Sequence, residues 1–131
     1  MRTLPVGDYL IFAVEHRGGD EGGPSLHMIV RMPADPPHQE TRRFQQLWRA
    51  DCFKVKPHEH LFGPAREVTR DFPALEAGDP VDWCLRRLEW FPGIVEEAGY
   101  PELARSMRLY KPAPDTYINT LAQWLQETAI T

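Results

Sequence analysis

The feature that most constrains this sequence is the separation of its two kinds of hydrophobic pattern. Strand-like runs fill the first half of the chain, and no helix-like segment lies between them. They cover residues 8–16, 25–32, 42–53 and 58–62. Because parallel strands need a long crossover, usually a helix, these strands are expected to be antiparallel. The sequence therefore predicts an α+β fold with an N-terminal antiparallel β-meander of about four strands.

The second half of the chain carries helical patterns. Asp79 followed by Pro80 is typical of a helix start, with Asp as the N-cap and Pro in the first turn. An apolar stripe follows at spacings of three and four, and Pro92 is expected to kink or split that helix. The stripe consists of Val81, Cys84, Leu85, Leu88, Phe91 and Val95. Pro101 and Pro114 predict the starts of two further helices.

Length and composition set the broad class. The 131 residues suit a single domain, with residues 1–63 as its sheet half and residues 79–131 as helices packed on one face of the sheet. Hydrophobic residues make up 42% and charged residues 26%, which is typical of a globular protein. The formal net charge of -4 gives no general attraction to nucleic acid.

The sequence also suggests where the protein works. No apolar run approaches the roughly 20 residues of a membrane helix. The apolar run from Tyr9 to Val14 is too short for a signal peptide. We therefore expect a cytoplasmic protein with no membrane contact. In that compartment Cys52 and Cys84 are expected to be reduced thiols that pack as small hydrophobic side chains.

Strand alternation predicts a polar cluster in the second hairpin. If residues 54–57 form the turn, Asp51 lies opposite His60 and Arg49 lies opposite Phe62, all on one face of the sheet. The other face is more apolar and is expected to look into the core. It carries Phe44, Trp48, Ala50, Cys52 and Leu61, with Glu59 as its one polar member.

The first hairpin extends this polar face. Pairing Leu10 with Met32 and Phe12 with Val30 places apolar residues side by side on one face. If all the strands form one meander, the polar faces of the two hairpins coincide. The shared polar surface then carries Glu15, His27, Arg31, Arg49, Asp51, His58 and His60.

This surface suggests a chemical site. Two His at positions i and i+2 of a strand point the same way, so His58 and His60 can reach one ion with Asp51 across the ladder. Such a ligand set suits Zn, Mn, Fe or Ni, and an open coordination position would activate water. Without a metal, a His oriented by Asp51 would act as a general acid–base. The simpler alternative is ordinary polar alternation on a solvated strand. Candidate substrate-binding residues are Arg49, Arg31, His27 and Glu15.

Other features favour binding to a partner. Trp83, Trp90 and Ile94 lie off the main helical stripe, so they form either a partner interface or a second buried side. A homodimer or a partner protein is expected on this basis. A basic run is read as a solvated strand face, with nucleic-acid binding as the less favoured alternative. That run contains Arg42, Arg43, Arg49, Lys54 and Lys56.

The segments Arg49-Ala50-Asp51 and Pro57-His58-Glu59-His60 resemble the pattern of small bacterial toxin–antitoxin proteins of the TumE type over residues 8–62. Those proteins have an N-terminal hairpin, a strand that ends in an aspartate, and a following His-x-His. Ala50 stands where they usually have an aromatic residue, and the helical half has no counterpart among them. The resemblance implies a partner-bound, toxin-like protein that acts on RNA or nucleotides through Asp51, His58 and His60.

Three functions follow from the sequence. The favoured one is a binding or interaction protein without chemistry of its own. The first alternative is a small hydrolase or nuclease, metal-assisted or acid–base, that uses Asp51, His58 and His60. The second alternative is a nucleic-acid-binding module.

Overall fold

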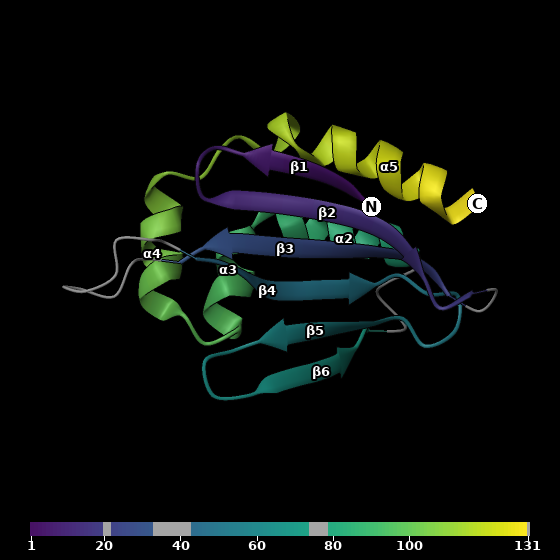
Figure 1. Cartoon of the computed structure of the whole chain (residues 1–131), viewed down its shortest axis with the longest axis horizontal. Helices are drawn as coiled ribbons and strands as arrows, with labels where there is room; N and C mark the ends of the chain where they lie inside the picture. Colours follow the sequence, from purple (N-terminus) through teal and green to yellow (C-terminus); the bar gives the residue numbers. More distant parts are fainter. Residues whose placement is uncertain (20–21, 33–42, 74–78, 131) are drawn as a thin grey trace.

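Six antiparallel strands form one sheet in chain order in the computed structural model, which describes residues 1–19, 22–32, 43–73 and 79–130 (Figure 1). The strands are β1 (Arg2–Val6), β2 (Leu10–Arg17), β3 (Gly23–Arg31), β4 (Phe44–Asp51), β5 (His58–Phe62) and β6 (Glu67–Asp71). The antiparallel α+β prediction is confirmed, but the strand count of about four is wrong. The additional strands, β1 and β6, are short edge strands with weak patterns. Pro5 lies within β1, which an edge strand tolerates, and Val68 is the one apolar residue of β6.

Helices follow the strands, as predicted. They are α2 (Pro80–Glu89), α3 (Phe91–Glu97), α4 (Pro101–Leu109), the short 3-10 helix η2 (Pro114–Thr116) and α5 (Ile118–Ile130). Asp79 caps α2 by accepting a hydrogen bond of 2.9 Å from the amide of Val81. Trp90 separates α2 from α3, so the helical pattern is split there, and Pro92 lies in the first turn of α3. Among the helices so described, none is long and apolar enough to span a bilayer.

The helices seal one face of the sheet, here called the core face. In Figure 1, α2 and α3 lie behind the strands, and α5 packs against β2 and β3. Phe12 on the core face stacks on Tyr117 at a ring separation of 5.2 Å and meets the edge of Phe91 at 6.5 Å. The Tyr117 hydroxyl donates a hydrogen bond of 2.7 Å to the carbonyl of Leu88, and burial raises its pKa to about 12. Aromatic pairs of this kind add about 0.5–1.5 kcal/mol each beyond area burial.

Both hairpins differ in register from the sequence prediction by two residues. Leu10 pairs with Val30 instead of Met32, and Asp51 pairs with His58 instead of His60. The loops explain the shift. Pairing in the first hairpin continues to the end of β2, and residues 52–57 make a wider connection in the second, with Lys56 at a φ of 52°. Because an even shift preserves alternation, each side chain keeps its predicted face.

A bulge reverses the alternation within β4. Trp48 pairs with Met28 while Gln46 pairs with Ile29, so Leu47 is an extra residue between them. Leu47 and Trp48 are consecutive and both fully buried. Residues before the bulge therefore exchange faces. The prediction that Phe44 lies in the core is wrong for this reason, since Phe44 is 47% exposed.

Glu59, the polar member of the core face, is a buried and fully paired carboxylate. It is 3% exposed and accepts hydrogen bonds of 2.8 Å from the Trp48 indole and 2.8 Å from Arg87. A third, from Arg70, measures 3.2 Å. Arg87 stands on α2 and Glu59 on β5, so the ion pair joins the two halves of the chain. Buried charges are tolerated when they are paired in this way.

Removal of the Glu59 carboxylate should destabilise the fold. Glu59→Ala leaves the Trp48 indole without its acceptor and removes one of the two carboxylates that pair with Arg87, the other being Glu97. It is expected to lower the free energy of unfolding by about 3–5 kcal/mol. Glu59→Gln keeps the shape and one acceptor, so its loss should be smaller, about 1–3 kcal/mol. Urea denaturation measures both. The exposed pair of Glu96 with Arg108 supplies the control, because Glu96→Ala should cost less than about 1 kcal/mol. Equal losses for Glu59→Ala and Glu96→Ala would contradict this account.

Candidate functional site

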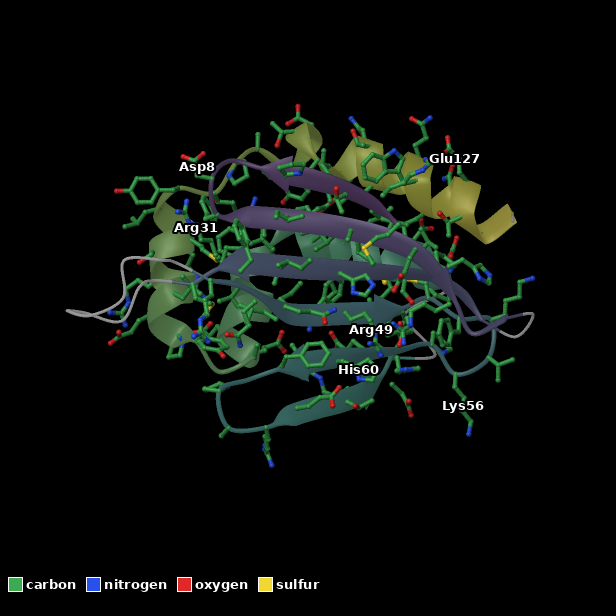
Figure 2. The ribbon with its side chains drawn as sticks, in the orientation of Figure 1. Asp8, Arg31, Arg49, Lys56, His60 and Glu127 are labelled. Atoms are coloured by element: carbon green, nitrogen blue, oxygen red, sulfur yellow. The ribbon has the colours of Figure 1, made fainter. Side chains whose placement is uncertain are left out.

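The predicted Asp and His residues meet on the face of the sheet opposite to the helices, here called the site face. Ladder pairing places Ser25, Asp51 and His58 in one row across β3, β4 and β5. Arg49 and His60 pair in the next row. Figure 2 shows Arg49 and His60 side by side on neighbouring strands. Asp51, His58 and His60 are therefore neighbours, although their register differs from the predicted one.

Asp51 is the centre of this group and is only 2% exposed. Its Oδ1 accepts hydrogen bonds from the Ser25 hydroxyl at 2.6 Å and from Arg49 Nε at 3.2 Å. Burial alone would raise the pKa of the Asp51 carboxyl. The hydrogen bond from Ser25 and the charge of Arg49 outweigh burial, so the pKa lies below its usual value. Asp51 is an ionised carboxylate at neutral pH.

The second oxygen of Asp51 faces two imidazoles. Its Oδ2 lies 3.0 Å from His58 Nε2 and 3.2 Å from His60 Nε2. The Nδ1 of His58 lies 2.8 Å from the carbonyl oxygen of Lys56, and the Nδ1 of His60 lies 2.8 Å from Glu67 Oε1. Both of those partners accept hydrogen bonds, so each Nδ1 carries a hydrogen. In a neutral imidazole the other nitrogen then has only a lone pair. When both rings are neutral, two nitrogen lone pairs thus point toward a carboxylate oxygen.

Three lone-pair donors in this arrangement have the spacing of metal ligands. One ligand atom each from Asp51, His58 and His60 lies within 4.8 Å of the others. Metal–ligand bonds of about 2.1 Å place the ligand atoms of a tetrahedral ion roughly 3.4 Å apart. The two distances from Oδ2 are close to that separation. The Nδ1 bonds also match the outer-shell contacts that orient His ligands in metal sites.

Arg49 supplies positive charge at the edge of the group. Its Nη2 lies 2.9 Å from His60 Nε2, and the same atom lies 3.3 Å from Asp51 Oδ2. The guanidinium therefore partly neutralises Asp51 and satisfies the lone pair of His60. His58 Nε2 has no comparable donor among the hydrogen bonds described. A cation bound between the two imidazoles would require Arg49 to move away from His60.

Glu15 and His27 lie on the site face and form a separate group. His27 Nε2 donates to Glu15 Oε1 at 3.0 Å, and His27 Nδ1 accepts from Gln46 at 2.6 Å. Burial lowers the pKa of His27 and outweighs the opposing effect of Glu15, which keeps the ring neutral. Both ring nitrogens are therefore occupied by protein partners. Arg31 stands six residues along β3 from Ser25, about 20 Å away, and Figure 2 shows it far from His60.

The other sequence features lie elsewhere. Lys54 and Lys56 are exposed in the β4–β5 connection. Arg43 directly precedes Phe44, the first residue of β4, and so lies at the other end of that strand. Arg49 is paired with Asp51, and Arg42 lies outside the described residues. Of the residues off the helical stripe, Ile94 is buried and Trp83 stacks on Phe72 at 4.0 Å, whereas Trp90 is 53% exposed.

Three residues that contact the site were absent from the sequence prediction: Ser25, Glu67 and Thr69. The sequence holds a signal for the first of them but not for the other two. Ser25 is two residues from His27 on β3, so alternation already places it on the site face. Glu67 and Thr69, which contact His60 Nδ1, belong to β6. Their sequence pattern gives no comparable signal, because β6 has little hydrophobic alternation.

Comparison with protein families gives one match. A family described as a domain of unknown function (DUF7700) matches residues 6–123, which include strands and helices alike. No curated protein and no solved structure gives a significant match. None of these comparisons connects the chain with the TumE-type proteins.

The hydrogen bond from Ser25 should set the acidity of Asp51. Ser25→Ala removes it, so the pKa of Asp51 should rise and the free energy of unfolding at pH 7 should fall by about 1.5–3 kcal/mol. Because the pKa of Asp51 is lowered in the folded chain, this contribution is present above about pH 4 and is lost as the pH falls through the folded pKa. Carboxyl ¹³C NMR titration and urea denaturation at pH 7 and pH 3 measure the two effects.

Ser106→Ala is the matched control, since Ser106 is exposed on α4. It should change neither the titration of Asp51 nor the stability by more than about 0.5 kcal/mol. An unchanged Asp51 titration in Ser25→Ala would show that the hydrogen bond does not set the pKa.

Proposed function

The chain belongs to the DUF7700 family of domains of unknown function, and from its site we propose that it binds a divalent transition-metal ion through Asp51, His58 and His60. One observation carries the proposal. The two Nε2 atoms lie 3.0 and 3.2 Å from a single carboxylate oxygen, while both Nδ1 atoms are held by oxygen acceptors. With both rings neutral, a metal ion would bind these lone pairs in place of the Arg49 guanidinium.

The chemistry of the ligand set narrows the choice of ion. Two imidazole nitrogens and one carboxylate oxygen suit Zn, Mn, Fe or Ni better than Ca or Mg, which prefer oxygen ligands. The outer shell supports the same choice. Lys56 and Glu67 fix the two rings through Nδ1, and Ser25 fixes the carboxylate.

Three protein ligands leave coordination positions for water and substrate. An ion bound in this way supplies a Lewis acid and a more acidic water, which is the chemistry of metal-assisted hydrolysis. Arg49, once it has moved away from His60, is placed to bind a phosphate or carboxylate group beside the ion. We therefore propose a hydrolase that acts on an anionic substrate. The phosphates of RNA or nucleotides, which the TumE-type resemblance implies, belong to this class.

Metal titration of the metal-free chain tests the proposal. Isothermal titration calorimetry with ZnCl₂ or MnCl₂ should show about one ion bound per chain. An ion concentration of 100 times Kd should raise the free energy of unfolding by about 2.7 kcal/mol. His58→Gln and His60→Gln should each weaken binding by at least about 10-fold, because each removes one of the three ligands.

His16→Gln is the control, since His16 is exposed at the end of β2. It should bind the ion as the wild type does. Arg49→Met removes the competing guanidinium and should bind the ion more tightly than the wild type. Absence of binding at millimolar ion, or equal binding by His60→Gln and His16→Gln, would refute the metal site.

Partner binding is the second candidate, supported by exposed apolar side chains around the end of α4. Leu109 and Tyr110 are 76% and 75% exposed, and Trp90 is 53% exposed. The Lys111 ammonium lies 5.5 Å from the centre of the Trp90 ring, which connects these residues. Exposed aromatic residues of this kind are enriched at protein interfaces. We propose a second copy of the chain as the partner.

Self-association should depend on Trp90. Sedimentation equilibrium of the wild type should show a reversible dimer, and Trp90→Ala should raise its dissociation constant by at least about 10-fold, as loss of a central aromatic contact does. Val55→Ala, a change at a 54% exposed site in the β4–β5 connection, should leave the constant unchanged. A wild type that stays monomeric throughout the accessible concentration range would exclude the dimer.

A further inference from the structure

The two cysteines of the chain meet in the core, although 32 positions separate them. Cys52 directly follows Asp51 at the end of β4, and Cys84 lies in α2. Their Sγ atoms are 2.9 Å apart, and both are free thiols. Even smaller carbon atoms pack at roughly 3.5–4.0 Å when they are not bonded. The two sulfur atoms are therefore within reach of a bond.

Both cysteines are held in place by their own backbone environment. The amide of Cys52 donates a hydrogen bond of 2.9 Å to the carbonyl of Pro24, which fixes the chain just after β4. Cys84 lies on the buried stripe of α2, whose start is fixed by the Asp79 cap. The backbone positions of both cysteines are therefore fixed by their own elements. A bond between them would link the sheet half of the chain to the helical half.

We propose that Cys52 and Cys84 are an oxidisable pair that a peroxide-class oxidant converts into an internal disulfide. The reaction balances in two steps. The Cys52 thiol and one hydrogen peroxide give Cys52 sulfenic acid and one water. The Cys84 thiol then attacks the Cys52 sulfur, which releases a second water and leaves the S–S bond. The two sulfur atoms are oxidised and the peroxide is reduced.

Exposure assigns different roles to the two residues. Cys52 retains 5% of its surface exposed and Cys84 none, so a small oxidant meets Cys52 first. Burial raises the pKa of the Cys84 thiol well above its usual value. Cys84 is therefore the resolving residue, and its reaction should be slow until Cys52 has been oxidised. Larger reagents should be excluded from both sulfur atoms while the chain stays folded.

The disulfide should stabilise the chain without use of the metal ligands. It closes the segment from Cys52 to Cys84, which contains β5 and β6. Closure of a loop of that length in the unfolded chain should raise Tm by about 10 °C. The proposal does not depend on metal binding, because the two sulfur atoms lie on the core face.

Peroxide oxidation of the folded, full-length chain tests the proposal. After treatment with hydrogen peroxide and removal of the excess, the intact mass should fall by two hydrogen atoms. Neither thiol should then react with iodoacetamide in denaturant, and Tm should rise. Dithiothreitol should reverse all three effects. The rate should not depend on protein concentration, since the bond forms within one chain.

Cys84→Ala and Cys52→Ala each leave a single thiol and should show neither the mass loss nor the rise in Tm. If a variant fails to fold, the alkylation count of the oxidised wild type still decides. Two alkylatable thiols after oxidation, oxygen addition without hydrogen loss, or a disulfide between two chains would each overturn the proposal.

Discussion

The structure depends on the alternation of side chains along six antiparallel strands. Each ladder pair transmits the orientation of a residue to the next strand, so Ala13, His27, Arg49, His60 and Thr69 form one row on the site face. The intervening rows point into the core, where the helices cover them. Removal of water from the core face stabilises the sheet, and the same geometry collects polar residues on the opposite face.

Alternation also explains how much of the fold could be predicted from the sequence. Pro80 and Pro101 predicted helix starts and Pro92 predicted the break between α2 and α3, because proline fixes φ and cannot continue a helix from the preceding turn. Both hairpin registers were wrong by two residues, yet the faces were correct, since an even shift leaves alternation intact. The bulge at Leu47 is an odd shift. It placed Phe44 on the site face instead of the core face, and the residues around Leu47 carry no pattern that predicts a bulge.

The candidate site was predictable to the same extent. Asp51, His58 and His60 could be brought together by parity alone, and so could Glu15 and His27. The hydrogen-bond partners that determine the chemistry of Asp51, His58 and His60 could not be predicted from the sequence. The contact of His60 with Glu67 depends on a sixth strand with almost no hydrophobic pattern. Arg31 shares the face but not the site, because alternation fixes the side of a sheet and not the distance along a strand.

Two buried carboxylates on neighbouring strands show why one position is a structural support and the other a candidate site. Glu59 meets the Trp48 indole and two guanidiniums, all of which only donate hydrogen bonds. Its charge is balanced, and nothing more is required there. Asp51 meets imidazoles whose donor nitrogens are already engaged by Lys56 and Glu67. When these rings are neutral, its Oδ2 faces two lone pairs, and the Arg49 guanidinium supplies part of the balancing positive charge. A buried carboxylate whose neighbours all donate hydrogen bonds stabilises a fold. A carboxylate with one oxygen that also faces neutral imidazole nitrogens leaves room for a cation, which a proton, a guanidinium or a metal ion can supply.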